Sequence, residues 1–198
     1  MRTFPSGARR TFSRPEGLAL HADCVSGCEA EALLAQVDAL PWRSDLRRRV
    51  QHHGYRYDYR ARQATAADRI GPLPAFLADL ARQLASEGLF AVPPDQVIVN
   101  EYLPGQGIAA HVDCRPCFGD VIASLSLGSA CVMRLQEVGG DGRLDLALPP
   151  RSLVTLRGPA RHGWTHAIPA RKSDLIDGTR IRRGRRVSLT FRTMRLEG

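Results

Sequence analysis

A run of short strand-like segments fills the second half of the chain. From residue 96 onward, stretches rich in branched residues alternate with turns that contain glycine or proline, which is typical of β-strands. The segments with this pattern are 96–103, 120–128, 131–138, 143–150, 152–158 and 185–194. Such a series of short strands indicates a β-sandwich or a jelly-roll barrel, in which the loops between strands carry the chemistry.

Helical periodicity is confined to the first half of the chain. Residues 28–40 and 73–90 have apolar side chains at helical spacing, and Pro41 ends the first of these segments. We expect both helices to pack on a sheet. The predicted fold class is therefore mainly β with flanking helices (α+β), with a flexible N-terminus over residues 1–17 and a single domain over residues 18–198.

A histidine and an aspartate lie two residues apart directly after a glycine turn. Side chains at i and i+2 on a strand point to the same face, so His111 and Asp113 can bind one metal ion together. A third ligand must come from elsewhere, and His162 and His166 are the candidates. Two histidines and one carboxylate form the facial triad of non-haem Fe(II) oxygenases. The spacing alone also allows a helix-capping aspartate beside an ordinary loop histidine.

The last predicted strand has one polar face and one apolar face. Alternation over residues 186–192 places Arg186, Ser188, Thr190 and Arg192 together. An inward polar face of this kind needs a buried partner. The arginine backbones are separated by about 20 Å, so two extended side chains could hold a small dicarboxylate. An edge strand with a solvated polar face is the alternative.

Residues 46–63 combine arginines with tyrosines at alternate positions. We predict a flap that covers a substrate base by stacking and holds its phosphates. A half-buried hairpin strand would give the same pattern. The candidate substrate residues in this flap are Arg49, Tyr55, Tyr57, Tyr59 and Arg60.

The formal net charge is +8, and Lys172 is the only lysine among 28 basic residues. An arginine-favouring codon bias would explain this composition. Guanidinium groups also match phosphate oxygens in bidentate geometry. The clusters at 47–49 and 180–186 favour the second explanation and predict nucleic acid, DNA or RNA, as the partner.

The N-terminus has no apolar signal segment, and no window approaches about 18 consecutive apolar residues. We therefore predict a cytoplasmic monomer with no membrane partner and no obligate protein partner. A disulfide framework is not expected in that compartment. The cysteines at 24, 28, 114 and 117 have spacings that a zinc site permits, and partly buried free thiols are the alternative.

Several segments in consistent order resemble the AlkB-like family of Fe(II)/2-oxoglutarate-dependent dioxygenases. They are NEYLPGQGIAAHVD (100–113), SLSLGS (124–129), GPARHGWTHAI (158–168) and RVSLTFR (186–192). The resemblance implies a double-stranded β-helix (jelly-roll) core. It places iron on His111, Asp113 and His166, where His166 is preferred because it occupies the WTH position.

The same resemblance implies Fe(II), 2-oxoglutarate and O2 as cofactor and cosubstrates. It places 2-oxoglutarate against Asn100 and Tyr102, with Arg186 at the distal carboxylate and Arg192 near the metal-bound carboxylate. Ser188 and Thr190 are implied as helpers on that face.

From the resemblance we predict oxidative demethylation of N-alkylated bases in nucleic acid, with release of succinate, CO2 and formaldehyde. The 198 residues leave no room for a fused RNA-recognition or methyltransferase domain, which favours DNA/RNA alkylation repair. The alternatives are hydroxylation of a modified transfer RNA wobble uridine or of a protein. A catalytically silent, basic nucleic-acid-binding domain is the non-enzyme alternative.

Overall fold

The structure is a computed structural model that describes residues 14–44, 46–59, 61 and 63–195. Most of the predicted flexible N-terminus therefore lies outside the described residues. Arg60 of the predicted flap lies outside them as well.

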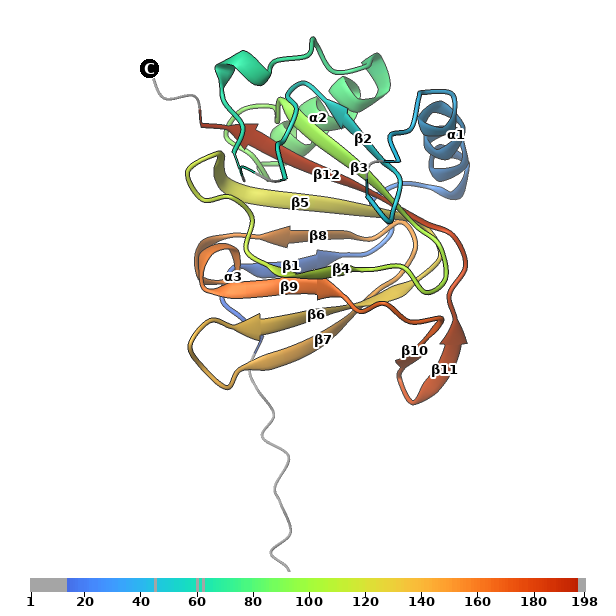
Figure 1. The fold of residues 1–198 in the computed structure, drawn as a ribbon. Helices are drawn as coiled ribbons and strands as arrows, with labels where there is room; N and C mark the ends of the chain where they lie inside the picture. The colour runs from blue at the N-terminus through green and yellow to red at the C-terminus, as the bar shows by residue number, and fades with distance from the viewer. Residues whose placement is uncertain (1–13, 45, 60, 62, 196–198) are drawn as a thin grey trace, which may run out of the picture.

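Two antiparallel sheets face each other (Figure 1). The larger sheet has the order β1-β8-β5-β12-β3-β2, and the smaller has the order β4-β9-β6-β7. The larger sheet contains β1 (Leu18–His21), β2 (Val50–His53), β3 (Gln96–Tyr102), β5 (Phe118–Gly128), β8 (Leu153–Leu156) and β12 (Arg186–Met194). The smaller contains β4 (Ile108–His111), β6 (Cys131–Glu137), β7 (Arg143–Leu148) and β9 (Trp164–Ile168). The predicted fold class, a mainly β jelly roll with N-terminal helices, is confirmed.

A separate hairpin and a few helices complete the fold. The hairpin consists of β10 (Ser173–Ile176) and β11 (Thr179–Arg182). The helices are α1 (Gly27–Asp38), η1 (Ala66–Asp68), α2 (Ala75–Ser86) and α3 (Gly158–His162).

Helices α1 and α2 cover the outer face of the larger sheet. Helix α1 begins at a capping box, in which Ser26 and Glu29 satisfy each other's backbone N–H groups. Its buried side chains recur at helical spacing, and so do those of α2, so each helix presents one apolar stripe to the sheet. These stripes join Val187, Leu189 and Phe191 of β12 in one hydrophobic cluster.

Strand β12 lies inside the sheet and not at its edge. It pairs with β3 on one side, where Ser188 is opposite Asn100, and with β5 on the other, where Ser188 is opposite Ser126. Because its apolar face is taken by the helices, its polar face points into the space between the two sheets. The solvated edge strand considered above is therefore wrong.

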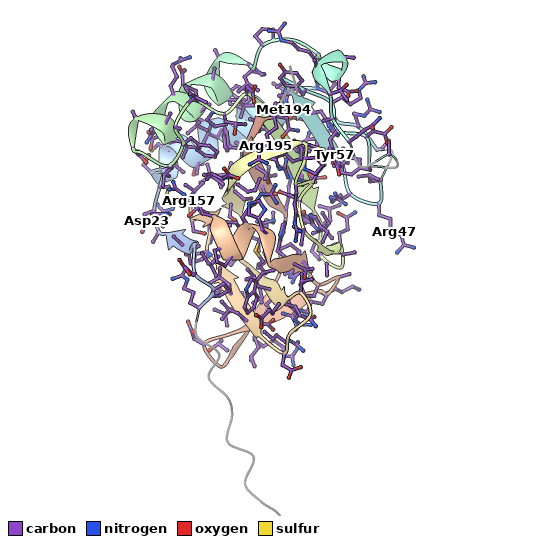
Figure 2. The ribbon with its side chains drawn as sticks, turned by 90° about the vertical axis from the view of Figure 1, so that its left-hand side faces the viewer. Asp23, Arg47, Tyr57, Arg157, Met194 and Arg195 are labelled. Atoms are coloured by element: carbon purple, nitrogen blue, oxygen red, sulfur yellow. A yellow bond between two sulfur atoms is a disulfide. The ribbon has the colours of Figure 1, made fainter. Side chains whose placement is uncertain are left out.

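The flap contains less regular structure than a hairpin would. Among its described residues only Val50–His53 forms a strand, and Tyr55 and Asp58 make isolated bridges to Arg69 and Gln63. Tyr57 and Met194 both pack against the cluster between the sheets, and Figure 2 shows Tyr57 on the same side of the molecule as Met194 at the end of β12.

Candidate metal and cosubstrate site

Two adjacent strands of the smaller sheet bring the candidate metal ligands together. His111 on β4 and His166 on β9 are direct cross-strand partners, so their imidazoles lie side by side with ring centroids 4.4 Å apart. The Asp113 carboxylate Oδ1 lies 3.5 Å from His111 Nε2 and 3.9 Å from His166 Nε2. One ligand atom from each residue lies within 4.8 Å of the others, a spacing that can hold a single ion. His162, the other candidate, lies elsewhere, with its Nε2 at 3.6 Å from Asp120 Oδ1.

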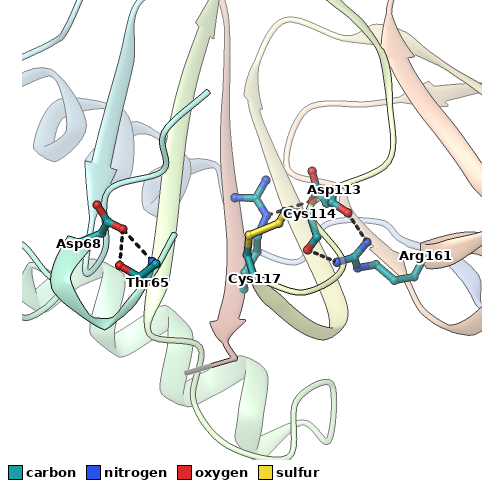
Figure 3. Close-up of a disulfide and its surroundings, with 7 residues drawn as sticks. Thr65, Asp68, Asp113, Cys114, Cys117 and Arg161 are labelled. Carbon is teal, nitrogen blue, oxygen red and sulfur yellow. Dashed lines mark hydrogen bonds and ion pairs between the residues drawn. A yellow bond between two sulfur atoms is a disulfide. The ribbon is translucent and has the colours of Figure 1, made fainter. Parts of the chain in front are cut away.

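Asp113 is fixed by two buried arginines that act on different atoms. The Arg192 guanidinium donates to carboxylate Oδ2 at 3.0 Å, which leaves Oδ1 facing the histidines. Arg161 donates to the backbone carbonyls of Asp113 and Cys114 at 3.0 and 3.2 Å (Figure 3). Burial alone would raise the pKa of the Asp113 carboxyl, but Arg192 and the two histidines hold this pKa well below its ordinary value.

Burial keeps the second histidine neutral. The side chain of His166 is enclosed between the sheets, and this desolvation lowers its pKa to about 4, although Asp113 acts in the opposite direction. A neutral imidazole beside an ionised carboxylate is the protonation state that metal ligation requires.

A small cavity of about 60 Å³ lies between this cluster and the polar face of β12. Arg186 lines its far side. Arg186 is only 3% exposed, and its guanidinium donates to Ser126 Oγ at 2.9 Å and lies over the Tyr102 ring. Its Nε finds no hydrogen-bond partner among the described residues. The predicted cosubstrate residues that line the cavity are Asn100, Tyr102, Arg186, Ser188, Thr190 and Arg192.

The Arg186 Nε without a hydrogen-bond partner shows what kind of group fits this cavity. A buried guanidinium without an acidic partner is costly, and a carboxylate at the far side of the cavity would supply that partner. The opposite side is lined by His111 and His166. The donor set therefore fits a metal ion together with a small dicarboxylate such as 2-oxoglutarate.

A larger cavity of about 320 Å³ opens on the other side of His111 and Asp113. Tyr57 and Tyr59 of the flap line it, with ring centroids 5.2 Å apart and nearly perpendicular planes. Phe118 forms another wall, against Tyr57. The volume of this cavity is within the usual range for small-ligand sites, roughly 300–1,000 Å³.

Two other predicted flap residues, Tyr55 and Arg49, do not line this cavity. Tyr55 is buried, and Arg49 pairs with Glu101, with Nε to Oε2 at 2.6 Å, over the Trp42 ring. Arg48 takes the position expected of Arg49. It lines the cavity and donates to Asn100 Oδ1 at 2.9 Å. The sequence contains the arginine run 47–49 but does not reveal which of the three side chains points into the cavity. The bend before β2 determines this orientation.

The four cysteines considered above fit neither alternative as a complete set. Cys114 and Cys117 form a disulfide in the segment that follows Asp113 (Figure 3). Cys24 and Cys28 are free thiols, and Cys24 packs in the cluster beneath the helices instead. The four-cysteine zinc site that the spacing permits is therefore wrong, because two of its thiolates are oxidised, whereas Cys24 and Cys28 agree with the free-thiol alternative. The sequence does not predict a disulfide framework, and the structure has one disulfide among the described residues.

Fold and site together define a non-haem Fe(II) oxygenase: a jelly roll in which the adjacent strands β4 and β9, with the segment after β4, bring two histidines and a carboxylate beside an arginine-lined cavity. The family model for the 2OG-Fe(II) oxygenase superfamily matches residues 30–192. The chain belongs to this superfamily, in its AlkB-like branch, whose enzymes use Fe(II), 2-oxoglutarate and O2. Membership of this superfamily argues against the alternative of a catalytically silent nucleic-acid-binding domain.

Several relatives support the AlkB-like branch. The chain is 38% identical to the Alkylated DNA repair protein ALKBH8 homolog of Arabidopsis thaliana, over 90% of this chain and 58% of that protein. It is 36% identical to the tRNA (carboxymethyluridine(34)-5-O)-methyltransferase ALKBH8 of Macaca fascicularis, over 94% of this chain and 32% of that protein. Protein L905 of Acanthamoeba polyphaga mimivirus is 35% identical, and the match covers 85% of its length. The chain therefore spans less than two thirds of the length of the two ALKBH8 proteins.

Solved structures agree on the fold. The structure of OsALKBH1 superposes with a TM-score of 0.65 at 19% identity, over 91% of this chain and 97% of that chain. A prolyl-4-hydroxylase from Pseudomonas putida superposes with a TM-score of 0.55 at 22% identity, over 92% of this chain and 94% of that chain. No helix in the described part of the chain is long and apolar enough to cross a membrane.

Proposed function

We propose that His111, Asp113 and His166 hold Fe(II), and that 2-oxoglutarate lies between them and Arg186. The observation that carries the proposal is the spacing of the three ligand atoms, all within 4.8 Å of one another. The unsatisfied Arg186 nitrogen supports the cosubstrate position.

Each protein group has a defined task in this reaction. Arg192 orients the Asp113 carboxylate, and Arg186 neutralises one carboxylate of the dicarboxylate. The apolar walls between the sheets exclude water from the reacting atoms. When bound, Fe(II), 2-oxoglutarate and O2 supply the oxidation of a C–H bond, with one oxygen atom going to the substrate and the other to succinate, and with CO2 released.

The larger cavity supports a nucleobase as the group that is oxidised. Tyr57 and Tyr59 offer aromatic surfaces next to the Asp113 side of the cluster, and Arg48 supplies a cation at the same mouth. The net charge of +8 favours a polyanionic substrate, DNA or RNA. A base inside a duplex must leave its stack before it can enter.

Two reactions of such a base remain as candidates. In the first, a methyl group on a ring nitrogen becomes hydroxymethyl, which breaks its C–N bond, returns a proton to nitrogen and leaves as formaldehyde. In the second, a carbon of a wobble-uridine substituent is hydroxylated and keeps its oxygen. The names of the ALKBH8 relatives, one from DNA repair and one from transfer RNA modification, support both.

One assay separates these candidates. The protein is incubated with Fe(II), 2-oxoglutarate and either methylated or wobble-uridine substrates, and succinate, formaldehyde and product mass are measured. The methylated substrates are DNA and RNA strands bearing 1-methyladenine or 3-methylcytosine, and the other is an anticodon stem-loop with a 5-substituted uridine at position 34. Demethylation predicts one formaldehyde per succinate, whereas hydroxylation predicts a gain of one oxygen and no formaldehyde.

The control for this assay is His111→Ala, which should abolish succinate formation with every substrate. If all oligonucleotides leave wild-type succinate formation at the level seen without substrate, nucleic acid is not the substrate.

A further inference from the structure

The β10–β11 hairpin presents a basic outward face. Leu175 is directly opposite Arg180, and Ser173 is directly opposite Arg182, so these four side chains lie on one face of the hairpin. Arg180 and Arg182 are exposed, and so is Leu175, at 65% of its surface. This face carries no acidic residue.

The opposite face anchors the hairpin to the body of the protein. Asp174 is 2% exposed and accepts hydrogen bonds from Arg171, Arg183 and the backbone N–H of Val132 at the start of β6. This buried network neutralises the acidic side chain of β10 and ties the hairpin to the smaller sheet. The outward arginines are therefore presented on a fixed support.

Two hydrogen bonds connect the hairpin to the mouth of the larger cavity through the turn between β3 and β4. The backbone N–H of Gly105 donates to the carbonyl of Arg171 at 3.2 Å. The Gln106 side chain donates to the carbonyl of Arg47 at 2.7 Å. Arg48, the next residue, lines the cavity. The turn and the hairpin lie at the same end of the molecule in Figure 1, and Arg47 projects from the surface in Figure 2.

The cations of this region differ from several others on the surface in their lack of a carboxylate partner among the described residues. Arg82, Arg134 and Arg195 are each paired with an aspartate. Within the described part of the chain, no carboxylate lies at ion-pair distance from the exposed cations that we call the basic edge. Its members are Arg47, Lys172, Arg180 and Arg182. Unpaired cations keep their full capacity to bind external anions.

We propose that the basic edge binds the phosphodiester backbone of the nucleic-acid strand whose base enters the larger cavity. The inference rests on the proposed function and adds the path of the strand: from Arg48 at the mouth, past Arg47 and the β3–β4 turn, onto the outward face of the hairpin. Arginine and lysine pair with phosphate oxygens, and the exposed Leu175 supplies apolar contact between them.

The test is a double charge reversal on the hairpin, Arg180→Glu with Arg182→Glu. The matched control is Arg82→Glu with Arg143→Glu, which changes the net charge equally on α2 and at the other end of the smaller sheet. Binding of fluorescent single strands of DNA and RNA of the same sequence is measured from about 50 to 200 mM salt. Succinate formation without nucleic acid and the melting temperature are measured in parallel.

The hairpin variant should bind either strand at least tenfold more weakly than the wild type at the lowest salt. Its slope of log K against log salt should be smaller by about 1.5, since each lost phosphate contact removes about 0.7–0.9. The control variant should weaken binding less than threefold, and basal succinate formation should remain in both. A larger loss with DNA or with RNA identifies the strand that this edge prefers.

Equal weakening by the two variants would overturn the inference, because it would reflect net charge alone. Unchanged binding by the hairpin variant would also overturn it, while oligonucleotide oxidation by the wild type would still support the proposed function. If the wild type binds phosphatidylserine vesicles but no oligonucleotide, the inference and the proposed substrate class both fail.

Discussion

Asp113 is positioned by two arginines that contact different parts of the residue. Its carboxylate is oriented by Arg192, and its backbone carbonyl is held by Arg161. Arg161 is 1% exposed and comes from α3, just ahead of the strand that carries His166. One helix–strand unit therefore supplies both a candidate ligand and the side chain that positions another.

Replacing Arg161 tests its positioning role. Arg161→Met fills a similar volume but leaves the carbonyls of Asp113 and Cys114 without this donor. We expect the Fe(II) concentration for half-maximal activity to rise about 10- to 100-fold, as when other supports of metal ligands are removed. The matched control is Arg157→Met, which loses a bond to the carbonyl of Leu89 and should keep the wild-type Fe(II) response. A lower melting temperature with an unchanged Fe(II) response would mean that Arg161 is only structural.

Replacing Arg186 tests the dicarboxylate position. Arg186→Gln removes the buried charge expected to pair with 2-oxoglutarate, and loss of such a pair amounts to about 3–5 kcal/mol. The Kd for 2-oxoglutarate should rise by roughly 100-fold or more. The neighbouring Arg185 faces the other way, toward Glu101 and Asp38, so Arg185→Gln should leave this Kd unchanged. Equal effects of the two substitutions would contradict the assignment.

At the scale of elements, β12 has one face in the hydrophobic core and the other in the candidate site. Its odd-numbered side chains from Val187 to Phe191 join the helices, and its even-numbered ones face the cavity of about 60 Å³. Because β12 is hydrogen-bonded on both sides, its register is fixed by β3 and β5 from Arg186 to Arg192. A shift of one residue would exchange the two faces.

The Cys114–Cys117 disulfide closes a four-residue loop directly after Asp113. Closing a loop of this size stabilises a fold by roughly 2 kcal/mol in the chain-entropy treatment. A reductant should therefore lower the melting temperature of the wild type by about 4–8 °C, as expected for a domain of this length. The double variant Cys114→Ser with Cys117→Ser should melt at the lower temperature with or without reductant. A wild-type protein that melts unchanged after thiol counting proves reduction would contradict this stabilisation.

The amount of structure that can be predicted from the sequence depends on segment length. Strands β3, β5, β6 and β12 were predicted within a few residues, because each extends over at least seven residues. Strands β1, β4 and β9 were not predicted, because their four or five residues carry little pattern and their pairing is set by distant partners. Strand β8 is equally short but was predicted, because its run of branched residues is bounded by Pro150 and Gly158. The pairing of β4 with β9 is the step that brings His111 to His166.

The site could be predicted only where a local pattern carries it. The HxD pair and the alternating face of β12 are such patterns, and the preference for His166 over His162 came from the family resemblance. Arg48 and Arg161 could not be predicted, because their partners, Asn100 and the carbonyl of Asp113, are far away in the chain. The disulfide depends on the conformation of the loop after Asp113, which spacing alone does not determine.

At the scale of the whole molecule, stability should depend on pH through His52 of β2. This side chain accepts a hydrogen bond from the backbone N–H of Tyr57, which requires a neutral ring. Burial, together with Arg43, Arg192 and Arg56, lowers its pKa to about 4 from an ordinary 6.5. Between these values the unfolded chain binds more protons than the folded protein, so the stability present above pH 6.5 is lost as the pH falls toward 4.

Urea unfolding of the metal-free protein at pH 7.5 and pH 5 measures this effect. The midpoint should be lower at pH 5, and His52→Asn should reduce the difference because the titrating ring is gone. An identical pH dependence in wild type and variant would show that His52 does not contribute.

The most direct test of the central claim is an anaerobic titration of the protein with Fe(II) in the presence of 2-oxoglutarate. Visible absorption reports the charge-transfer band that forms when metal and cosubstrate share one site. We predict a band that saturates at one Fe(II) per chain, that requires 2-oxoglutarate, and that is lost in His166→Ala but kept in His162→Ala. No band in the wild type, or a band that survives in His166→Ala, would contradict the assignment of His111, Asp113 and His166 as the iron ligands.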